Sequence, residues 1–477
     1  MRSIAAAIAV WALAAAAPAD TTAIDWAPVG EKASAIREST AAPGLGFALL
    51  HGGEPVLLEG YGLADRDPER PVTPDTVFAV GSISKVVTAT LLVALRDEGR
   101  LRLDDPLGQY LPEGVAAPTG PLGETATLRD LAMHTSGFAR MPSNMKRPSP
   151  EGDPYNGYEE RRLFAAIPRT PPDAPAGRRY GYSNFAFGVL GRVIEKAAGE
   201  PYAELVRKRI AEPLGLDSMR VAPRREDAGP ELARGYQGDA PEKPAPWWNL
   251  GAMDSAGSVV ASTRDLAAFL AWQMRAGESE TPAVASRSLR EAQTPARPTG
   301  KEWDTAVGLG WHITRKPYGE VVWHNGSVGG FASFMGFERR RGLGVVLLAN
   351  SDRGVTAEGF DLLGEAAGLL DAVAPIPSTE LVAARRVASL ITADPPKDLG
   401  GAFHPGFLDE VPALGLRLAF AGHFATHGSP GEIELTKGDE PGSTRATVTM
   451  EREGPLVFDF MVAGEDDPRV VYLLFGE

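Results

Sequence analysis

A serine and a lysine three residues apart are the side chains best suited to nucleophilic chemistry. They stand in the segment Ser82-Ile83-Ser84-Lys85, and the apolar spacing after it predicts a helix that ends at Gly99. Residues i and i+3 of a helix lie about 5 to 6 Å apart on one face, so the amine can take the hydroxyl proton. Burial and the positive end of a helix both disfavour an ammonium, which makes such a lysine a competent base. We therefore predict Ser82 as a nucleophile and Lys85 as its base.

The same spacing recurs in Ser143-Asn144-Met145-Lys146. This second copy lies within residues 141–175, a segment so rich in proline that it cannot be continuous regular structure. Without a helix to fix the geometry, we interpret the second copy as a coincidence.

A tyrosine and an asparagine stand in the segment Tyr182-Ser183-Asn184. A phenol near a lysine ammonium has its anion favoured, so Tyr182 can shuttle protons to a leaving group and from water. The amide of Asn184 can bind a substrate carbonyl.

A glycine near the end of a predicted strand completes the set, in Trp323-His324-Asn325-Gly326-Ser327. A glycine there lets a substrate backbone approach closely. The pattern His-x-Gly also begins at His51 and His404, but only the copy at His324 ends one strand and precedes further strands.

The elements that must position these residues alternate between helices and antiparallel strands. We expect a helix over 29–42, a hairpin of strands over 44–50 and 55–61, and a short helix from Thr127 to residue 133. Strands are expected over 321–324, 330–338 and 343–350. Helices around an antiparallel meander predict an α+β domain.

Taken together, the motifs resemble those of the penicillin-recognising serine hydrolases, which include class C β-lactamases, serine D-alanyl-D-alanine peptidases and related esterases. Ser-x-x-Lys, Tyr-x-Asn and His-x-Gly follow in that family's order, and the resemblance covers roughly residues 24–370. It implies a β-lactamase-like domain over 24–373, with an antiparallel sheet flanked by helices and an all-helical lobe. It also implies that Ser82 attacks a carbonyl while the backbone N–H groups of Ser82 and Ser327 hold the oxyanion, with no metal or cofactor.

The third motif departs from that of the β-lactamases, which generally have Lys-Thr-Gly where this chain has His324-Asn325-Gly326. Histidine is mostly neutral near pH 7, so the fixed charge that attracts a β-lactam carboxylate is missing. We expect ester or D-amino-acid amide and peptide substrates, supplied as small acyl compounds or peptidoglycan-like peptides. Two alternatives stay open: a β-lactam or peptidoglycan sensor that is acylated but turns over very slowly, and a weak β-lactamase. Trp247 and Trp248 could line an acyl pocket, although packing is the commoner role of such aromatics.

Residues 379–477 are predicted to form a second, smaller α+β domain after a proline-containing linker at 374–378. Helical segments over 381–391 and 407–424 precede four strands, expected over 432–435, 445–451, 456–462 and 469–475. This order faintly resembles cystatin-like or NTF2-like modules, while some relatives have a small β-barrel instead.

Composition excludes several other classes of protein. The chain has 477 residues, a formal charge of −14 and no cysteine, which excludes thiol nucleophiles and disulfides and disfavours nucleic acid as a partner. Residues 1–19 are typical of a cleaved signal peptide rather than a membrane anchor, so we expect a periplasmic or secreted protein. His423 and His427 have the spacing of zinc ligands, but His-Glu-x-x-His is absent. Ser136 lacks the Gly-x-Ser-x-Gly context of α/β-hydrolases.

Overall fold

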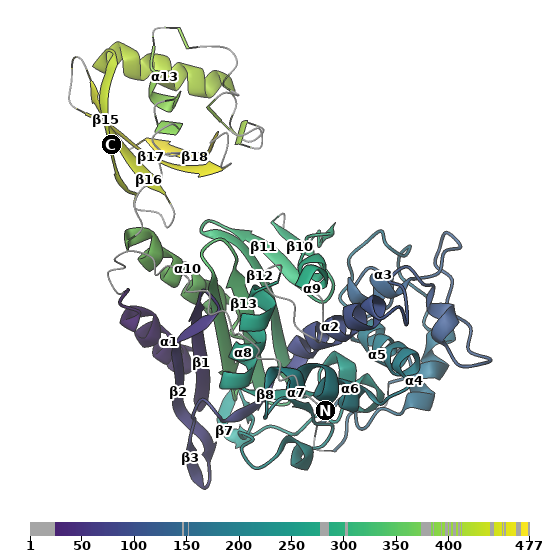
Figure 1. The fold of residues 1–477 in the computed structure, drawn as a ribbon. Coiled ribbons are helices and arrows are strands. Elements are labelled where there is room, and N and C mark those ends of the chain that lie inside the picture. The colour runs from purple at the N-terminus through teal and green to yellow at the C-terminus, as the bar shows by residue number, and fades with distance from the viewer. Residues whose placement is uncertain are drawn as a thin grey trace, which may run out of the picture.

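The computed structural model describes residues 24–145, 147–150, 152–276, 286–300 and 304–373, together with most of 383–475. A large sheet with helices on both faces adjoins a helical lobe, and a smaller unit follows α10 (Figure 1). The predicted signal peptide at 1–19 and linker at 374–378 lie outside the described residues.

The central sheet has nine antiparallel strands in the order β3-β2-β1-β14-β13-β12-β11-β10-β9. The hairpin and the meander predicted from the sequence form its middle, and the three strands before the meander were not predicted. Strand β12 also runs on past His324, four residues beyond the predicted end. The strands are β1 (Gly44–His51), β2 (Glu54–Arg66), β3 (Glu69–Pro71), β9 (Arg297–Pro298), β10 (Thr305–Val307), β11 (His312–Lys316), β12 (Gly319–Val328), β13 (Phe331–Glu338) and β14 (Leu343–Ala349).

Helices cover both faces of this sheet, which explains why β1 is apolar at nearly every position. Because successive side chains of a strand point to opposite faces, Phe47 and Leu49 enter one core and Ala48 and Leu50 enter the other. The first core is closed by α1 (Ala27–Ser39) and α10 (Thr356–Val373), and the second by α8 (Thr263–Met274).

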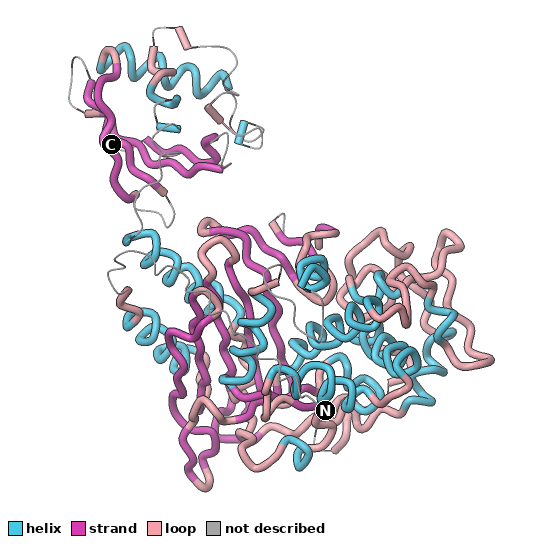
Figure 2. Tube along the Cα trace, in the orientation of Figure 1, coloured by secondary structure: helices cyan, strands magenta, loops and turns pink. Residues whose placement is uncertain are grey.

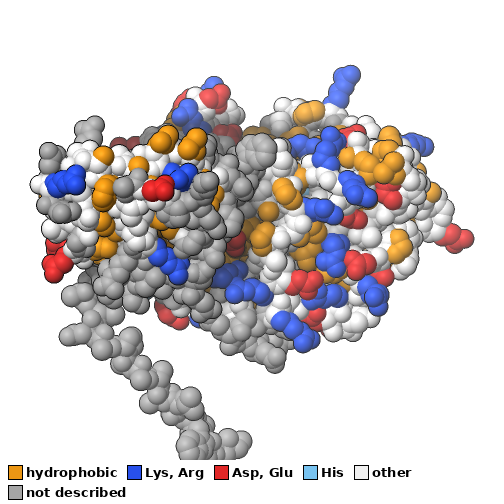
Figure 3. Space-filling model, turned by 90° about the horizontal axis from the view of Figure 1, so that it is seen from above, with side chains coloured by type: hydrophobic (Ala, Val, Ile, Leu, Met, Phe, Trp, Pro, Cys, Tyr) orange, Lys and Arg blue, Asp and Glu red, His pale blue; other side chains and the backbone are white. Residues whose placement is uncertain are grey.

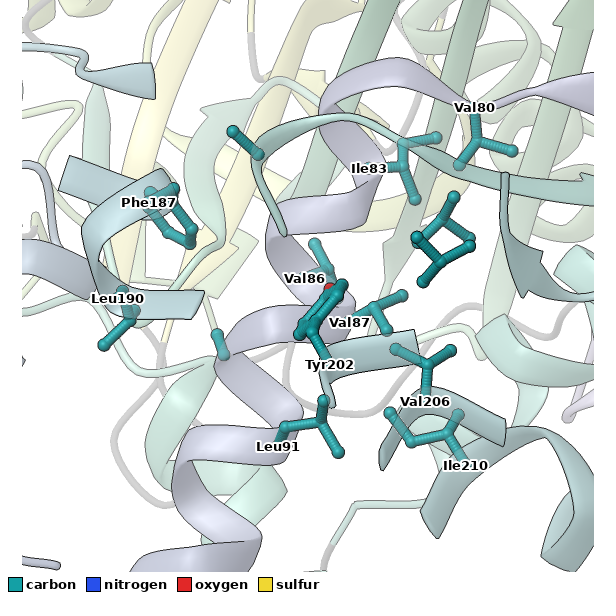
Figure 4. Close-up of a cluster of buried hydrophobic side chains, with 14 of the residues drawn as sticks. Val80, Ile83, Val86, Val87, Leu91, Phe187, Leu190, Tyr202, Val206 and Ile210 are labelled. Carbon is teal, nitrogen blue, oxygen red and sulfur yellow. The ribbon is translucent and has the colours of Figure 1, made fainter. Parts of the chain in front are cut away.

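The helical lobe is built around α2 (Ser84–Asp97), the helix predicted from the serine and lysine motif. Its apolar residues are buried almost all round, and they pack against side chains of α5 (Asn184–Ala198), α6 (Tyr202–Val206) and the following turn (Figure 4). A buried hydrogen bond of 2.8 Å joins the hydroxyls of Thr88 and Tyr202 across this core. Packing on every side therefore fixes the axis of α2 and the residues at its start.

Shorter elements complete the lobe and join it to the sheet. Long loops lie among them, most visibly around α3 and α4 (Figure 2). The shorter elements are η1 (Gly81–Ile83), η2 (Leu107–Tyr110), α3 (Leu128–Ala132), α4 (Glu160–Ala166), η3 (Ile167–Arg169), η4 (Arg207–Ala211), α7 (Glu212–Leu214), η5 (Arg225–Ala228), η6 (Gly251–Ala256), α9 (Ser286–Ala292), the sheet β4 (Val77–Ala79), β8 (Val259–Ser262) and β5 (Arg220–Val221), and the hairpin β6 (Tyr236–Gln237) and β7 (Ala240–Pro244).

The structure tests two local predictions in this lobe. Thr127 caps α3 as expected, since its hydroxyl accepts the N–H of Asp130 while the Asp130 carboxylate accepts the N–H of Thr127. The proline-rich segment 141–175 is largely loop, but it contains α4 and η3, where the chain Glu160–Ala166 has no proline.

The C-terminal unit has a core of its own beneath α13 (Ala413–His427). Four antiparallel strands follow in sequence order: β15 (Pro430–Lys437), β16 (Thr444–Met450), β17 (Leu456–Ala463) and β18 (Arg469–Phe475). All four match predicted strands. The helix α13 begins at Ala413, later than predicted, and residues 407–408 within the predicted span are also helical.

Among the described residues, no helix combines the length and the apolar character needed to cross a bilayer. On the face that Figure 3 shows, Lys and Arg side chains are interspersed with Asp and Glu.

Candidate active site

Ser82 and Lys85 lie at the junction of η1 and α2, with hydroxyl and amine in direct contact. Ser82 is the middle residue of η1, and Lys85 is the second residue of α2. Their Oγ and Nζ atoms are 2.9 Å apart, and Nζ also donates to the carbonyl of Ala256 at 2.6 Å. The i, i+3 spacing thus brings the two groups together as the sequence predicts.

The environment of Lys85 disfavours its charged form. The side chain is fully buried, and burial, followed by the positive charge of Arg140, holds the pKa of Lys85 well below its ordinary value. A neutral amine has a lone pair with which it can accept the proton of Ser82. The site therefore provides a nucleophile with a base beside it.

Hydrogen bonds hold the backbone of the nucleophile turn in place. The Ser84 hydroxyl donates to the carbonyl of Gly81 at 2.7 Å and accepts the N–H of Val259 at 3.0 Å. On the other side, the Ser333 hydroxyl of β13 donates to the carbonyl of Val80 at 2.8 Å. Strands β8 and β13 thus hold the turn from both sides.

Strand β12 passes so close to this turn that glycine is required at the contact. A Cβ on Gly326 would lie 2.1 Å from the Val80 carbonyl oxygen and 2.9 Å from the Ser82 nitrogen. A Cβ on Gly81, whose φ is +52°, would lie 2.8 Å from the Ser327 nitrogen. The backbones that contain the Ser82 and Ser327 N–H groups are therefore in contact.

The Ser327 N–H is directed away from β13. Gly329 and Gly330 both have positive φ and form the two-residue turn between Val328 and Phe331, which pair with each other. Ladder hydrogen bonds alternate from that pair, so Ser327 belongs to a non-bonded pair. Since β11 pairs with β12 only as far as Trp323, the edge beyond it is open toward the nucleophile turn. The N–H groups of Ser82 and Ser327 can thus face one oxyanion.

Tyr182 completes the contacts of the nucleophile. Its hydroxyl forms a hydrogen bond with Ser82, and Lys85 Nζ lies 5.0 Å from the centre of its ring. Burial raises the pKa of Tyr182, an effect larger than that of the Ser82 hydrogen bond or of Arg140. The phenol therefore stays protonated, and the expectation that its anion is favoured is wrong, because burial outweighs the positive charge near it.

His134 belongs to this site, although the sequence predicted only that the short helix from Thr127 stops just before it. It is buried, has a φ of +57°, and its ring centroid lies 4.3 Å from that of Tyr182. Its Nδ1 accepts the N–H of Ser183 at 3.1 Å, and its carbonyl accepts the N–H of Gly181 at 2.7 Å. His134 thus holds the chain on both sides of Tyr182. Its place beside Ser136 in the predicted helix stop carried no signal for this contact.

Asn184 is the first residue of α5 and is buried. Its Nδ2 donates to the hydroxyl of Tyr155 at 3.1 Å, while its Oδ1 is buried without a hydrogen-bond partner among the described residues. Tyr155 in turn lies beside Trp248, with ring centroids 6.0 Å apart. Asn184 is thus near Tyr182, and its binding of a substrate carbonyl stays a prediction.

His324 is fully buried on β12, with its ring centroid 6.3 Å from that of Tyr182. Its Nδ1 lies 2.6 Å from the carbonyl oxygen of Asn325, so Nδ1 holds the proton and Nε2 is the free acceptor. Nε2 is buried without a hydrogen-bond partner among the described residues. Burial, followed by the charges of His312 and Lys85, holds the pKa of His324 well below its ordinary value, so this position has no cation near neutral pH.

The other candidate residues lie apart from this cluster or have structural partners. The Ser143 hydroxyl lies 2.7 Å from that of Thr170, and Lys146 is outside the described residues. Among described side chains, no group of three or more Asp, Glu or His could hold a metal ion. The Nδ1 of His427 lies 3.2 Å from the backbone carbonyl oxygen of His423, one helical turn earlier, and the two ring centroids are 5.9 Å apart. The indole N–H of Trp247 donates to the Pro223 carbonyl at 3.1 Å.

A separate cavity of about 420 Å³ lies between the β1–β2 hairpin and α8. Its lining includes Pro55, Leu58, Ala267 and Trp272 but none of the predicted site residues. Without a nucleophile and base in contact, its size alone does not make it the active site.

Comparison with known proteins agrees with this geometry. The family model described as Beta-lactamase matches residues 31–368. The unguisins hydrolase ungD' of Aspergillus campestris is 30% identical over 324 residues, which cover 65% of this chain and 58% of that protein. Penicillin-binding protein 4 of Amycolatopsis lactamdurans is 28% identical over 359 residues, covering 71% and 90% respectively. The octameric penicillin-binding protein homologue of Pyrococcus abyssi, 22% identical with a TM-score of 0.59, covers 94% of this chain and 95% of its own.

A serine hydrolase of the β-lactamase type is the class that the fold and the site define. The chain belongs to the Beta-lactamase family, which the match over residues 31–368 establishes.

Proposed function

We propose that the protein hydrolyses esters, or amides and peptides of D-amino acids, through an acyl-enzyme on Ser82. The contact of 2.9 Å between the Ser82 hydroxyl and a buried Lys85, whose pKa is held well below its ordinary value, is the observation on which the proposal depends. A serine beside such a base is an activated nucleophile. The chain has no cysteine that could act as a nucleophile instead.

Acylation follows from the contacts of these groups. Lys85 accepts the hydroxyl proton as Ser82 Oγ bonds to the substrate carbonyl carbon, and the N–H groups of Ser82 and Ser327 hold the oxyanion. The protonated phenol of Tyr182 donates its proton to the leaving group as the carbonyl–heteroatom bond breaks. The Lys85 ammonium then returns a proton to the Tyr182 phenolate, which restores both groups. Water repeats the sequence on the acyl-enzyme and frees the acid.

The substrate class rests on His324. Because this residue is buried and neutral, it offers no positive charge to the carboxylate of a β-lactam, in contrast to the lysine of Lys-Thr-Gly. The relatives include one named as a hydrolase of unguisins and one named as a penicillin-binding protein, which supports acyl substrates in general. A comparison of p-nitrophenyl esters, nitrocefin and a D-alanyl-D-alanine peptide would rank the candidates.

Labelling with a fluorophosphonate tests the nucleophile. We expect one adduct, located by mass spectrometry on Ser82, and none on the Ser82→Ala variant. Ser143→Ala removes the other Ser-x-x-Lys serine and should be labelled like the wild type. An adduct on another residue of the wild type contradicts the assignment.

Burst kinetics distinguish a catalyst from an acylated sensor. With a chromogenic ester, a hydrolase continues to release product after the first equivalent, whereas a sensor releases one equivalent per Ser82 and stops. Release that stops after one equivalent would favour the sensor over the hydrolase.

We also propose that the protein is exported after cleavage behind Ala19, on the evidence of its N-terminal sequence. Sequencing the N-terminus of protein recovered outside the cytoplasm should begin at Asp20. Recovery only from the cytoplasm with Met1 retained contradicts this proposal.

A further inference from the structure

Arg140 presents a guanidinium group at the site that the mechanism above does not use. The backbone carbonyl of Arg140 accepts the N–H of Asn184 at 3.0 Å and that of Phe185 at 3.2 Å, the first residues of α5. Its side chain is exposed, and Cζ lies 5.2 Å from the centre of the Tyr182 ring. The backbone of Arg140 is thus held at the first two residues of α5, and its guanidinium lies over the Tyr182 ring.

This guanidinium has no carboxylate partner among the described residues. The chain has 62 Asp and Glu against 48 Lys and Arg, and two well-buried arginines are paired with acids: Arg192 with Asp254 at 2.8 Å and Arg341 with Asp371 at 2.6 Å. Arg140 forms neither an ion pair nor a side-chain hydrogen bond in the described structure; its contact is with the ring of Tyr182. A cation without a partner, in a protein with excess acid, is available to an external anion.

The charge of Arg140 acts on the site rather than on the solvent alone. It contributes to lowering the pKa of Lys85 and of His134, and it opposes the burial that raises the pKa of Tyr182 and Tyr155. The Arg140 carbonyl accepts the N–H groups of Asn184 and Phe185, so Arg140 lies on the side of Tyr182 where α5 begins. A substrate held at Ser82 therefore comes within reach of the guanidinium.

The sequence His324-Asn325-Gly326 on β12 makes the position of the Arg140 charge relevant to substrate binding. Strand β12 offers no cation because His324 is neutral, whereas the guanidinium of Arg140, from a loop, lies over the ring of Tyr182. An arginine suits this role because its planar fork can hold both oxygens of a carboxylate.

We propose that Arg140 binds a free carboxylate of the substrate, and that the preferred acyl compounds bear such a group. The inference rests on the proposed function, since it assumes acyl transfer at Ser82. The carboxylate can stand on the acyl part or on the leaving group, because both lie beside Tyr182 when its phenol protonates the leaving group.

Two matched pairs of esters test the proposal and separate these positions. For the acyl part, 4-nitrophenyl hydrogen adipate is compared with 4-nitrophenyl adipamate, which replaces the carboxylate by an uncharged amide of similar size. For the leaving group, 3-carboxyphenyl acetate is compared with 3-carbamoylphenyl acetate. The readout is the ratio of kcat/KM within each pair at one pH, so any change in the protonation of Lys85 cancels.

We expect the wild type to prefer the carboxylate in at least one pair by about tenfold, mainly through KM. Arg140→Ala should reduce that ratio to about one, and Arg140→Lys should retain part of it because the charge stays while the fork is lost. Arg161→Ala removes another exposed arginine, one paired with Glu159, and should leave the ratio unchanged.

Two results overturn the inference: no carboxylate preference of the wild type in either pair, or a preference that survives in Arg140→Ala. Failure of the proposed function is distinct, because the wild type would then hydrolyse none of the four esters and show no fluorophosphonate adduct on Ser82. A preference in one pair alone supports the inference and locates the carboxylate.

Discussion

The imidazole of His134 lies against the phenol of Tyr182, with ring centroids 4.3 Å apart and 33° between the planes. The same imidazole accepts the backbone N–H of Ser183 at 3.1 Å, so one side chain fixes both the ring of Tyr182 and the start of α5. We regard His134 as a residue that positions Tyr182.

Replacing His134 by phenylalanine should separate positioning from packing. The ring remains, but the buried Ser183 N–H loses its acceptor, at a cost of about 1 to 3 kcal/mol in the free energy of unfolding. We expect kcat for a p-nitrophenyl ester to fall by about 10- to 100-fold with little change in KM, since a small displacement of a catalytic group is costly. His423→Phe, in the C-terminal unit, should leave kcat unchanged. A variant with normal kcat and lowered stability would leave His134 a purely structural role.

The acid limb of the pH profile should report the protonation of Lys85. Its burial and the charge of Arg140 lower its pKa, so the amine is neutral, and the enzyme active, at pH values where an ordinary lysine is protonated. Removing the charge in Arg140→Ala favours the ammonium and should move the acid limb of kcat/KM for a neutral ester to higher pH. Arg140→Lys keeps the charge and should retain the wild-type limb. A shift to lower pH in Arg140→Ala contradicts this assignment.

Local patterns predicted the contact between Ser82 and Lys85 because its geometry is local. The spacing between Ser82 and Lys85, the apolar positions of α2 and the cap at Thr127 are each decided within one helical turn. The antiparallel meander followed from strand patterns of the same short range.

Contacts between distant segments could not be predicted in this way. The ring of His134 against Tyr182 and the guanidinium of Arg140 come from loops, and the Ala256 carbonyl beside Lys85 comes from the short helix η6; none of these segments contains a periodic signal. The protonation of Tyr182 was also misjudged, because it depends on burial of the whole cluster rather than on the identity of one neighbour.

Lys85 should reduce stability at neutral pH while it supports activity. Its pKa is lowered on folding, so the unfolded chain binds a proton that the folded chain does not. Stability therefore rises with pH between the folded pKa and the ordinary value of about 10.4, by up to about 1.4 kcal/mol per pH unit. Lys85→Met has no amine to titrate and so lacks this pH-dependent loss of stability. The Tm of the variant relative to the wild type should therefore be highest near pH 7 and decline toward pH 9.

The control for this comparison is Lys243→Met, which replaces an exposed lysine. Its Tm difference from the wild type should not vary with pH in the same window. If Lys85→Met shows the same flat difference, Lys85 is protonated in the folded protein and another group must deprotonate Ser82.

The close approach of β12 to the nucleophile turn leads to a prediction about Gly326. An alanine there would place its Cβ 2.1 Å from the Val80 carbonyl oxygen, 2.5 Å from Ser333 Oγ and 2.9 Å from the Ser82 nitrogen, so strand and turn must separate. Separation moves the Ser327 N–H away from the oxyanion, and loss of one such donor costs about 100- to 1,000-fold in kcat. Gly368→Ala, where nothing lies within 4 Å of the added Cβ, should leave kcat unchanged and stabilise α10 slightly. Steady-state kinetics on a chromogenic ester measures both variants, and near-normal turnover by Gly326→Ala would mean that Ser327 does not contribute to the oxyanion hole.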